Sequence, residues 1–308
     1  MKTQIISSKK RGFTLMELMV AMAITTIIVT VLVSITSIAL DTWNRSRAEL
    51  RASRQAKSMV DSMARDFEAL VTRRGNTNEW LSAISAQTMP GDRLLSTSAS
   101  KLIFFTAATD RYNGQIGVTG VDNGGDVSCV AYELEYKDPI GGNSGKFDTF
   151  ILNRKLVDPK EAFEKLLGKD ELETAFTSVS GNVNDSTNFV CENIFQFTVT
   201  FHVQVAQTVS GTTTLINVPV TVGKSSSGQI TKEFRIKGSG VIADISGGSV
   251  TSDQLKAGRV TAVEISLTVV SDFGIDQLRT RTFTGSQQSE FLAKNSYQYS
   301  KMVQLPSM

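Results

Sequence analysis

One carboxylate stands alone inside the longest apolar stretch of this sequence. From Phe13 to Leu40 the chain runs for 28 residues with a single charged side chain, Glu17. An ionised carboxylate at the centre of a bilayer costs about 3 kcal/mol on insertion scales, so such a residue is generally functional and paired. The partner expected for Glu17 is a positive charge at the same depth. The chemistry that this residue offers is therefore charge pairing.

The apolar stretch is long enough to cross a membrane as a helix. About 20 residues at a rise of ~1.5 Å each cover a hydrocarbon core of ~30 Å. Lys9, Lys10 and Arg11 precede the stretch, and flanking positive charges stay on the cytoplasmic side. A secretory signal has a shorter apolar core and a small-residue cleavage site. Neither feature is present, so we expect an anchor whose C-terminal bulk lies beyond the membrane.

Residues 12–17, Gly-Phe-Thr-Leu-Met-Glu, resemble the processing signature of type IV pilins and type II secretion pseudopilins. The resemblance implies that a membrane peptidase cleaves after Gly12 and methylates the new N-terminal residue, Phe13. Residues 1–12 are then a basic leader that is removed. It also implies that Glu17 neutralises the new α-amino group, on a neighbouring subunit, during assembly. An uncleaved signal anchor is the alternative reading of these residues.

A single long helix should carry the apolar stretch and continue beyond it. No glycine or proline occurs between Gly12 and Gly75, and these two residues are the strongest helix breakers. We predict a membrane and filament-core half at 13–40 and an amphipathic continuation at 41–74, with Gly75 at the C-cap. Apolar residues recur there at helical spacing. This stripe consists of Trp43, Leu50, Ala56, Val60, Met63, Phe67 and Leu70. The charged residues between them, Asp66 included, are expected to face solvent.

Residues 75–308 should form a β-rich head outside the membrane. Residues 194–205 alternate apolar and polar side chains, as a half-buried antiparallel strand does. Further strands are expected at 101–106, 129–136, 150–156, 212–222, 232–236 and 259–270. Loops are expected at 80–100, 223–229 and 246–253, a short helix after Asp158-Pro159, and an irregular tail from Phe283. The predicted fold class is α+β: a pilin-like lollipop with a long N-terminal helix packed on an antiparallel β-rich head.

The head offers few residues for catalysis. The chain has one histidine, His202, which lies on the polar face of an expected strand. Residues 122–126 carry oxygen ligands without EF-hand spacing, and residues 223–225 lack the first glycine of a phosphate-binding loop. Cys129 and Cys191 are isolated, and an exported protein can hold them as one disulfide or as two thiols. We predict no enzyme activity, no cofactor and no metal.

The head also resembles, more loosely, that of J-type minor pseudopilins. The shared features are an Arg65-Asp66 pair at the end of the helix, a tyrosine-containing strand at 130–134, a Leu-x-Arg strand at 152–154 and a late strand at 260–269. The net charge is +2, and removal of the four leader charges (Lys2, Lys9, Lys10 and Arg11) lowers it to −2. No aromatic-basic pattern suggests a nucleic-acid partner.

Together these observations predict a minor pseudopilin that is processed and assembled into a periplasmic pseudopilus. That filament would serve type II secretion or a type IV pilus-like machine. The chain would span the inner membrane once, with its N-terminus cytoplasmic and its head periplasmic. The implied partners are other pilin or pseudopilin subunits, a prepilin peptidase and methyltransferase, an inner-membrane assembly platform and membrane lipid. The alternatives are a signal-anchored periplasmic enzyme or binding domain, and a pilus-tip adhesin.

Overall fold

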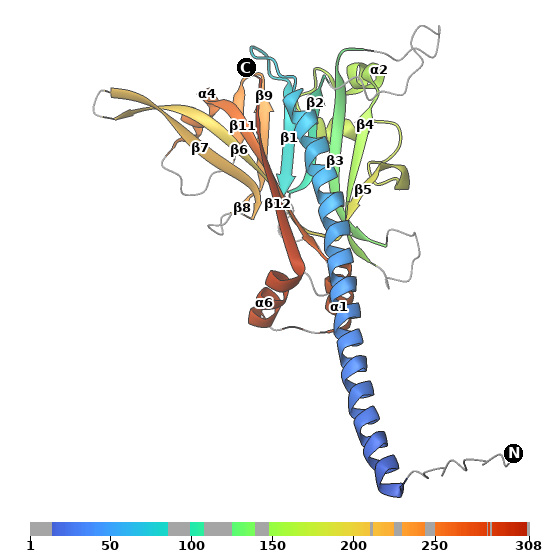
Figure 1. Cartoon of the computed structure of the whole chain (residues 1–308). Helices are drawn as coiled ribbons and strands as arrows, with labels where there is room; N and C mark the ends of the chain where they lie inside the picture. The colour runs from blue at the N-terminus through green and yellow to red at the C-terminus, as the bar shows by residue number, and fades with distance from the viewer. Residues whose placement is uncertain are drawn as a thin grey trace, which may run out of the picture. The chain divides into compact units, whose positions relative to one another are not determined.

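The computed structural model of this chain is drawn in Figure 1. It describes residues 14–85, 99–107, 125–138, 148–209, 212–224, 230–243, 250–281, 283 and 285–306. The chain divides into two units, residues 1–48 and 49–308. Helix α1 (Leu15–Glu68) belongs to both units.

Helix α1 ends at Glu68, six residues before the predicted end at residue 74. The backbone after Glu68 leaves the helix and pairs with a strand: Leu70 forms a β-bridge with Thr106, and the Val71 N–H donates to the Phe105 carbonyl. Gly75 does adopt a positive φ of 92°, but it lies in the following turn and is no helix cap. The predicted end at residue 74 is therefore wrong, because strand pairing replaces the last helical turn.

The head contains two antiparallel sheets. The seven-stranded sheet has the order β10-β9-β1-β2-β3-β4-β5. Its strands are β1 (Glu79–Ser85), β2 (Ala99–Thr106), β3 (Ser128–Lys137), β4 (Thr149–Val157), β5 (Phe189–Glu192), β9 (Glu233–Lys237) and β10 (Gly240–Ala243). The five-stranded sheet has the order β12-β11-β6-β7-β8. Its strands are β6 (Ile194–Val209), β7 (Thr212–Lys224), β8 (Ile230–Thr231), β11 (Arg259–Val270) and β12 (Ser296–Gln304).

Short helices connect the strands. They are α2 (Pro159–Glu161) with the π-helical turn Ala162–Leu166, α3 (Leu172–Phe176), the 3-10 turn Ser186–Asn188, α4 (Ser252–Ala257), α5 (Asp272–Thr280) and α6 (Gly285–Asn295). The predicted helix start is confirmed, because the Asp158 side chain accepts the Glu161 N–H and Pro159 is the first helical residue. All seven predicted strands are present within a few residues of their expected bounds. The α+β fold class is thus confirmed.

The last turns of α1 and both sheets share one core. Phe67 of α1 stacks on Phe104 of β2, with ring centroids 4.4 Å apart, and meets Phe201 of β6 edge-on at 6.4 Å. Phe201 in turn stacks on Phe234 of β9 at 3.9 Å. Aromatic side chains from both sheets therefore pack against the helix.

Two segments were predicted wrongly as irregular. Strand β1 occupies the start of the expected loop 80–100, and residues 86–98 lie outside the described residues. Its first five residues are all buried, because a second apolar cluster, which includes Trp80 and Phe105, covers the other face of the sheet. A strand buried on both faces shows no alternation. The tail after Phe283 forms α6 and β12, an edge strand in which Val303 alone is fully buried.

Candidate functional site

The N-terminal end of α1 is fixed by a reciprocal capping box. The Glu17 N–H donates to Thr14 Oγ1 (3.2 Å), while Glu17 Oε2 accepts both the Thr14 N–H and the Thr14 hydroxyl (2.9 Å each). The signal was present in the sequence as Thr-x-x-Glu ahead of an apolar run, and sequence analysis overlooked it. The carboxylate of Glu17 is thereby held at Thr14, the residue that follows Phe13 in the sequence. Phe13 itself, Gly12 and the leader residues Lys9, Lys10 and Arg11 lie outside the described residues.

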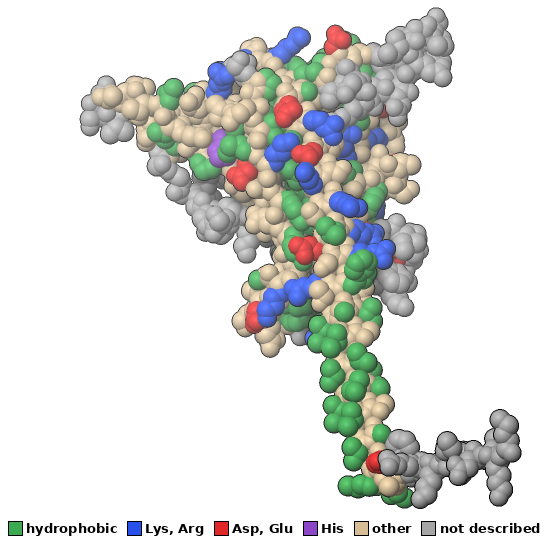
Figure 2. Space-filling view, in the orientation of Figure 1, with side chains coloured by type: hydrophobic (Ala, Val, Ile, Leu, Met, Phe, Trp, Pro, Cys, Tyr) green, Lys and Arg blue, Asp and Glu red, His purple; other side chains and the backbone are tan. Residues whose placement is uncertain are grey.

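The apolar half of α1 exposes its side chains all round. Every residue from Leu15 to Leu40 is exposed, and Figure 2 shows hydrophobic side chains along this part of the helix. Within the described residues, α1 is the one helix long and apolar enough to cross a membrane. Five of its hydroxyl groups donate to a backbone carbonyl four residues back in the same helix. These donors, at 2.8 to 3.0 Å, are Thr25, Thr26, Thr30, Ser34 and Thr36.

A second carboxylate of α1, Asp66, is buried in the head. The Arg154 guanidinium of β4 donates from Nε to Asp66 Oδ2 (2.9 Å) and from a terminal nitrogen to Oδ1 (3.1 Å). The Tyr132 hydroxyl of β3 also donates to Asp66 Oδ2. Asp66 and Tyr132 are fully buried. The prediction that Asp66 faces solvent is therefore wrong. Its position three residues after Met63 places it on the buried stripe.

Electrostatics keep the phenol and the guanidinium of this triad protonated. Burial raises the pKa of Tyr132 well above its ordinary value, and the neighbouring Asp66 charge raises it further. For Arg154, burial alone would lower the pKa, but the hydrogen bond to Asp66 and the nearby negative charge raise it overall. The result is a neutral phenol and a permanent guanidinium around one carboxylate. Leaving any of these groups without its partner would expose a buried polar group to an apolar core.

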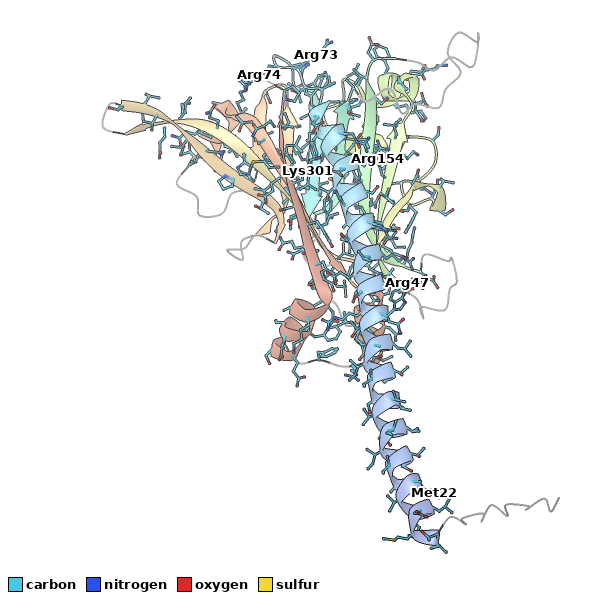
Figure 3. All side chains as sticks on the ribbon, viewed as in Figure 1. Met22, Arg47, Arg73, Arg74, Arg154 and Lys301 are labelled. Carbon is cyan, nitrogen blue, oxygen red and sulfur yellow. The ribbon has the colours of Figure 1, made fainter. Side chains whose placement is uncertain are left out.

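Three more ion pairs join α1 to the head. Lys301 of β12 lies 2.9 Å from Asp61, and Arg51 lies 3.0 Å from Glu192 of β5 and 3.5 Å from Asp272 of α5. The hydrogen bond from Lys301 lowers the pKa of Asp61. Arg154 and Lys301, which Figure 3 labels, thus reach the same helix from the two different sheets. Residues 51–66 are tied to both sheets by charge as well as by apolar packing.

The predicted stripe on the second half of α1 is only partly right. Its last five members, from Ala56 to Leu70, are buried, but Trp43 and Leu50 are 67% and 59% exposed. Ala52, Met59 and Ala64 are buried in addition. The alanines on this face let the sheets approach the helix closely. A stripe predicted mainly from large apolar residues does not identify such positions.

The two cysteines are separate thiols, so the disulfide alternative is wrong. Cys129 on β3 and Cys191 on β5 are both buried and free. Strand β4 lies between β3 and β5, which separates the two strands by about 10 Å, beyond the reach of a disulfide. Burial raises the pKa of Cys191 to about 12 and that of Cys129 well above its ordinary value. Both residues act as small apolar core residues.

The other candidate residues from the sequence are not brought together into one site among the described residues. His202 is half-buried on β6, 3.4 Å from the Asn217 side chain. Of the oxygen-rich turn, residues 122–124 lie outside the described residues. Among the described residues, no three His, Cys, Asp or Glu side chains are grouped so that they could hold a metal ion.

Comparison with known proteins places the N-terminal segment in a family. Residues 7–33 match the family model described as the prokaryotic N-terminal methylation motif. The matched segment includes residues 12–17, which carry the resemblance to type IV pilins and pseudopilins. No match is found among the curated protein sequences.

A solved structure, the type IV-like pilin TTHA1219 from Thermus thermophilus, is similar over 83% of this chain and 97% of that one. The identity is 11% and the TM-score 0.31.

Proposed function

We propose that this chain is a structural subunit of a pilin-type filament. The observation that carries the proposal is the match to the N-terminal methylation motif at residues 7–33, which overlaps a helix whose apolar residues are exposed from Leu15 to Leu40. Such a helix needs lipid or other helices to cover it. In this proposal a peptidase cleaves after Gly12 and methylates Phe13, and the released subunit leaves the lipid for a bundle of similar helices.

Glu17 is proposed to select and align the neighbouring subunit. Cleavage creates a positive α-amino group at Phe13, and the capping box holds the Glu17 carboxylate over the first turn of its own helix. A carboxylate that moves into an apolar bundle either pairs with a cation or takes up a proton. Pairing with the amine of a neighbour keeps both charges and fixes the axial register of the two helices.

The last turns of α1 are proposed to move with the head as one body. These turns carry the Asp66 triad and the shared aromatic core. In finer detail, we propose a minor pseudopilin in a periplasmic pseudopilus, anchored in the inner membrane with its head periplasmic. A type II secretion system or a type IV pilus-like machine would supply the peptidase, the platform and the other subunits. The loose head pattern supports the J-type assignment.

The mass of the N-terminal peptide from the native membrane tests the proposal. We expect a methylated peptide that begins at Phe13. A mature protein that begins at Met1 would overturn processing and favour the rival, a plain signal anchor with an enzyme or binding domain.

Two substitutions separate the cap from the charge. Glutamine can replace glutamate in a capping box, so Glu17→Gln retains the helix start and removes only the charge, whereas Glu17→Leu removes both. We expect both variants to insert and to be cleaved, and both to fail in filament assembly, measured by shearing or co-purification. Normal assembly of Glu17→Gln would show that Glu17 serves only as a cap.

A further inference from the structure

The hairpin of β6 and β7 extends beyond the rest of its sheet. Strand β11 pairs with β6 only as far as Gln204, opposite Arg259, and β8 pairs with β7 only from Val222 onward. Within the described residues, 205–209 and 212–217 therefore form a two-stranded ribbon with no further strand on either side. Figure 1 shows this ribbon projecting from the head.

The composition of the ribbon is unusual for a free edge. No Asp, Glu, Lys or Arg occurs from Asn193 to Gly223, and Leu215 is 67% exposed. Exposed edges normally carry charges or bulges that prevent pairing with other chains, and a lone two-stranded ribbon is only marginally stable in water. Threonine, valine and isoleucine favour extended pairing. The edge has the features of one that is covered by another strand.

Pro219 fixes which backbone groups of β7 point outward. It lies opposite His202 in an unbroken antiparallel register, and proline has no N–H to donate to β6. The pair is therefore the type without mutual hydrogen bonds, and the Pro219 backbone faces away from β6. By the same parity, Thr213, Leu215 and Asn217 also direct their N–H and C=O groups outward.

Side-chain contacts agree with this parity. Pairs without mutual backbone hydrogen bonds bring their side chains closest, and Thr208 and Thr213 lie opposite each other with hydroxyl oxygens 2.9 Å apart. Thr200 and Thr221 repeat the contact at 2.8 Å. The outer edge thus presents N–H donors at residues 213, 215 and 217, and Pro219 ends the series.

We propose that the outer edge of β7 from Thr213 to Asn217, the docking edge, receives an extended strand from the head of a neighbouring subunit of the same filament. The proposal rests on the proposed function, which brings heads side by side. Strand addition supplies affinity through backbone hydrogen bonds, and an uncharged edge suits such a partner better than a charged surface. One edge that pairs with a different surface of the neighbour is a heterologous contact, and repeated heterologous contacts generate helical filaments.

Photo-crosslinking in the native cell tests the contact. A photoreactive amino acid is placed at Thr213 in the full-length chain, and the matched control places it at Phe163, an exposed residue of the π-helical turn. We expect an adduct from position 213 that contains a second chain with a prepilin-type N-terminus, and a much weaker adduct from position 163. No adduct from position 213, or an adduct with a protein of another class, overturns the proposal.

A proline scan then tests the backbone bonds. Leu215→Pro removes one outward N–H without touching the bonds to β6, and Pro219 shows that this strand accepts proline at that parity. Loss of one hydrogen bond should lower the adduct at least about fivefold. Leu215→Ala keeps the N–H and should retain most of the adduct. Asn217→Pro is a second variant of the same kind, used if Leu215→Pro lowers the melting temperature.

Failure of this proposal is distinguishable from failure of the proposed function. Unchanged adducts in folded proline variants overturn the docking edge, even when the mature N-terminal peptide begins at methylated Phe13. A peptide that begins at Met1 overturns the filament function itself, and the adduct with a prepilin-type neighbour is then absent as well.

Discussion

The two halves of helix α1 have opposite relations to their surroundings. From Leu15 to Leu40 most side chains are apolar, and all are exposed. From Ala52 to Phe67 the composition is mixed, yet eight residues are buried, Asp66 among them. Polarity alone therefore does not determine burial along this helix. The first half is exposed along its described length, whereas the second half has two sheets that cover it and supply a cation for its buried acid.

The two carboxylates of α1 express the same contrast. Glu17 is exposed and its hydrogen bonds go to Thr14, in its own first turn. Asp66 is bound by Tyr132 and Arg154, which are distant in sequence. A buried ion pair is costly to break because the remaining charge is left unpaired. Asp66 thus stabilises the head of its own chain, while Glu17 is available for a charge on another.

The largest expected effect is the loss of the buried acid. Asp66→Ala leaves Arg154 unpaired and should lower the free energy of unfolding of the head by about 3–5 kcal/mol, measured by denaturant titration of the full chain in detergent. Asp61→Ala is the control on the same helix. Its pair with Lys301 is about 40% exposed on each side, where solvent weakens ion pairs, so a much smaller loss is expected. Equal losses of unfolding free energy from the two variants would mean that the buried pair stabilises the head no more than the exposed pair.

Methionine occurs in both halves of α1 and allows a matched comparison. Met63 is fully buried, whereas Met22 is 64% exposed, and Figure 3 labels Met22 on the apolar half. Met63→Ala should destabilise the head by about 2–5 kcal/mol, because it removes buried contacts and leaves a cavity. Met22→Ala should leave head unfolding in detergent unchanged. A similar loss from Met22→Ala would mean that the apolar half contributes to the stability of the head.

The sequence predicted the parts of this chain that have a simple period. The apolar run after Gly12 predicts a long helix, and the alternation in residues 194–205 predicts a strand with one buried face. Both the helix and the strand are present. Strand β1 is buried on both faces, so its apolar and polar residues do not alternate and its sequence resembles an irregular segment. Strand β12 has an almost wholly polar sequence because it is an edge, and its pairing with β11 depends on the backbone.

The candidate sites were predictable to different degrees. The capping contact of Glu17 is local: Thr14 and Glu17 are three residues apart, so the capping box can be recognised in the sequence. Asp66 was expected in solvent because its charge outweighed its position on the buried stripe. Its partners on β3 and β4 are brought to it by sheet order, which no local pattern determines. A charged residue at a stripe position is the signal that would have identified it.

The smallest expected effect concerns the phenol of the triad. Tyr132→Phe removes one hydrogen bond to Asp66 and leaves the pair with Arg154 intact, so a loss of about 1–2 kcal/mol is expected at neutral pH. Because the pKa of Tyr132 is raised in the folded head, the unfolded chain releases this proton first as the pH rises above about 10. The wild-type head should therefore lose stability above that pH, at up to about 1.4 kcal/mol per pH unit from this group.

Tyr132→Phe removes that contribution, because phenylalanine does not titrate. The difference in unfolding free energy between the wild type and Tyr132→Phe should be constant from pH 7 to pH 9 and should shrink above pH 10. Subtraction of the two profiles cancels the other tyrosines, the lysines and the two buried thiols, which titrate in both proteins. A difference that stays constant to pH 11 would mean that Tyr132 ionises as readily in the folded head as in the unfolded chain. Solvent would then reach the triad around Asp66. The two halves of α1 would differ in apolar packing but not in access of water to their carboxylates.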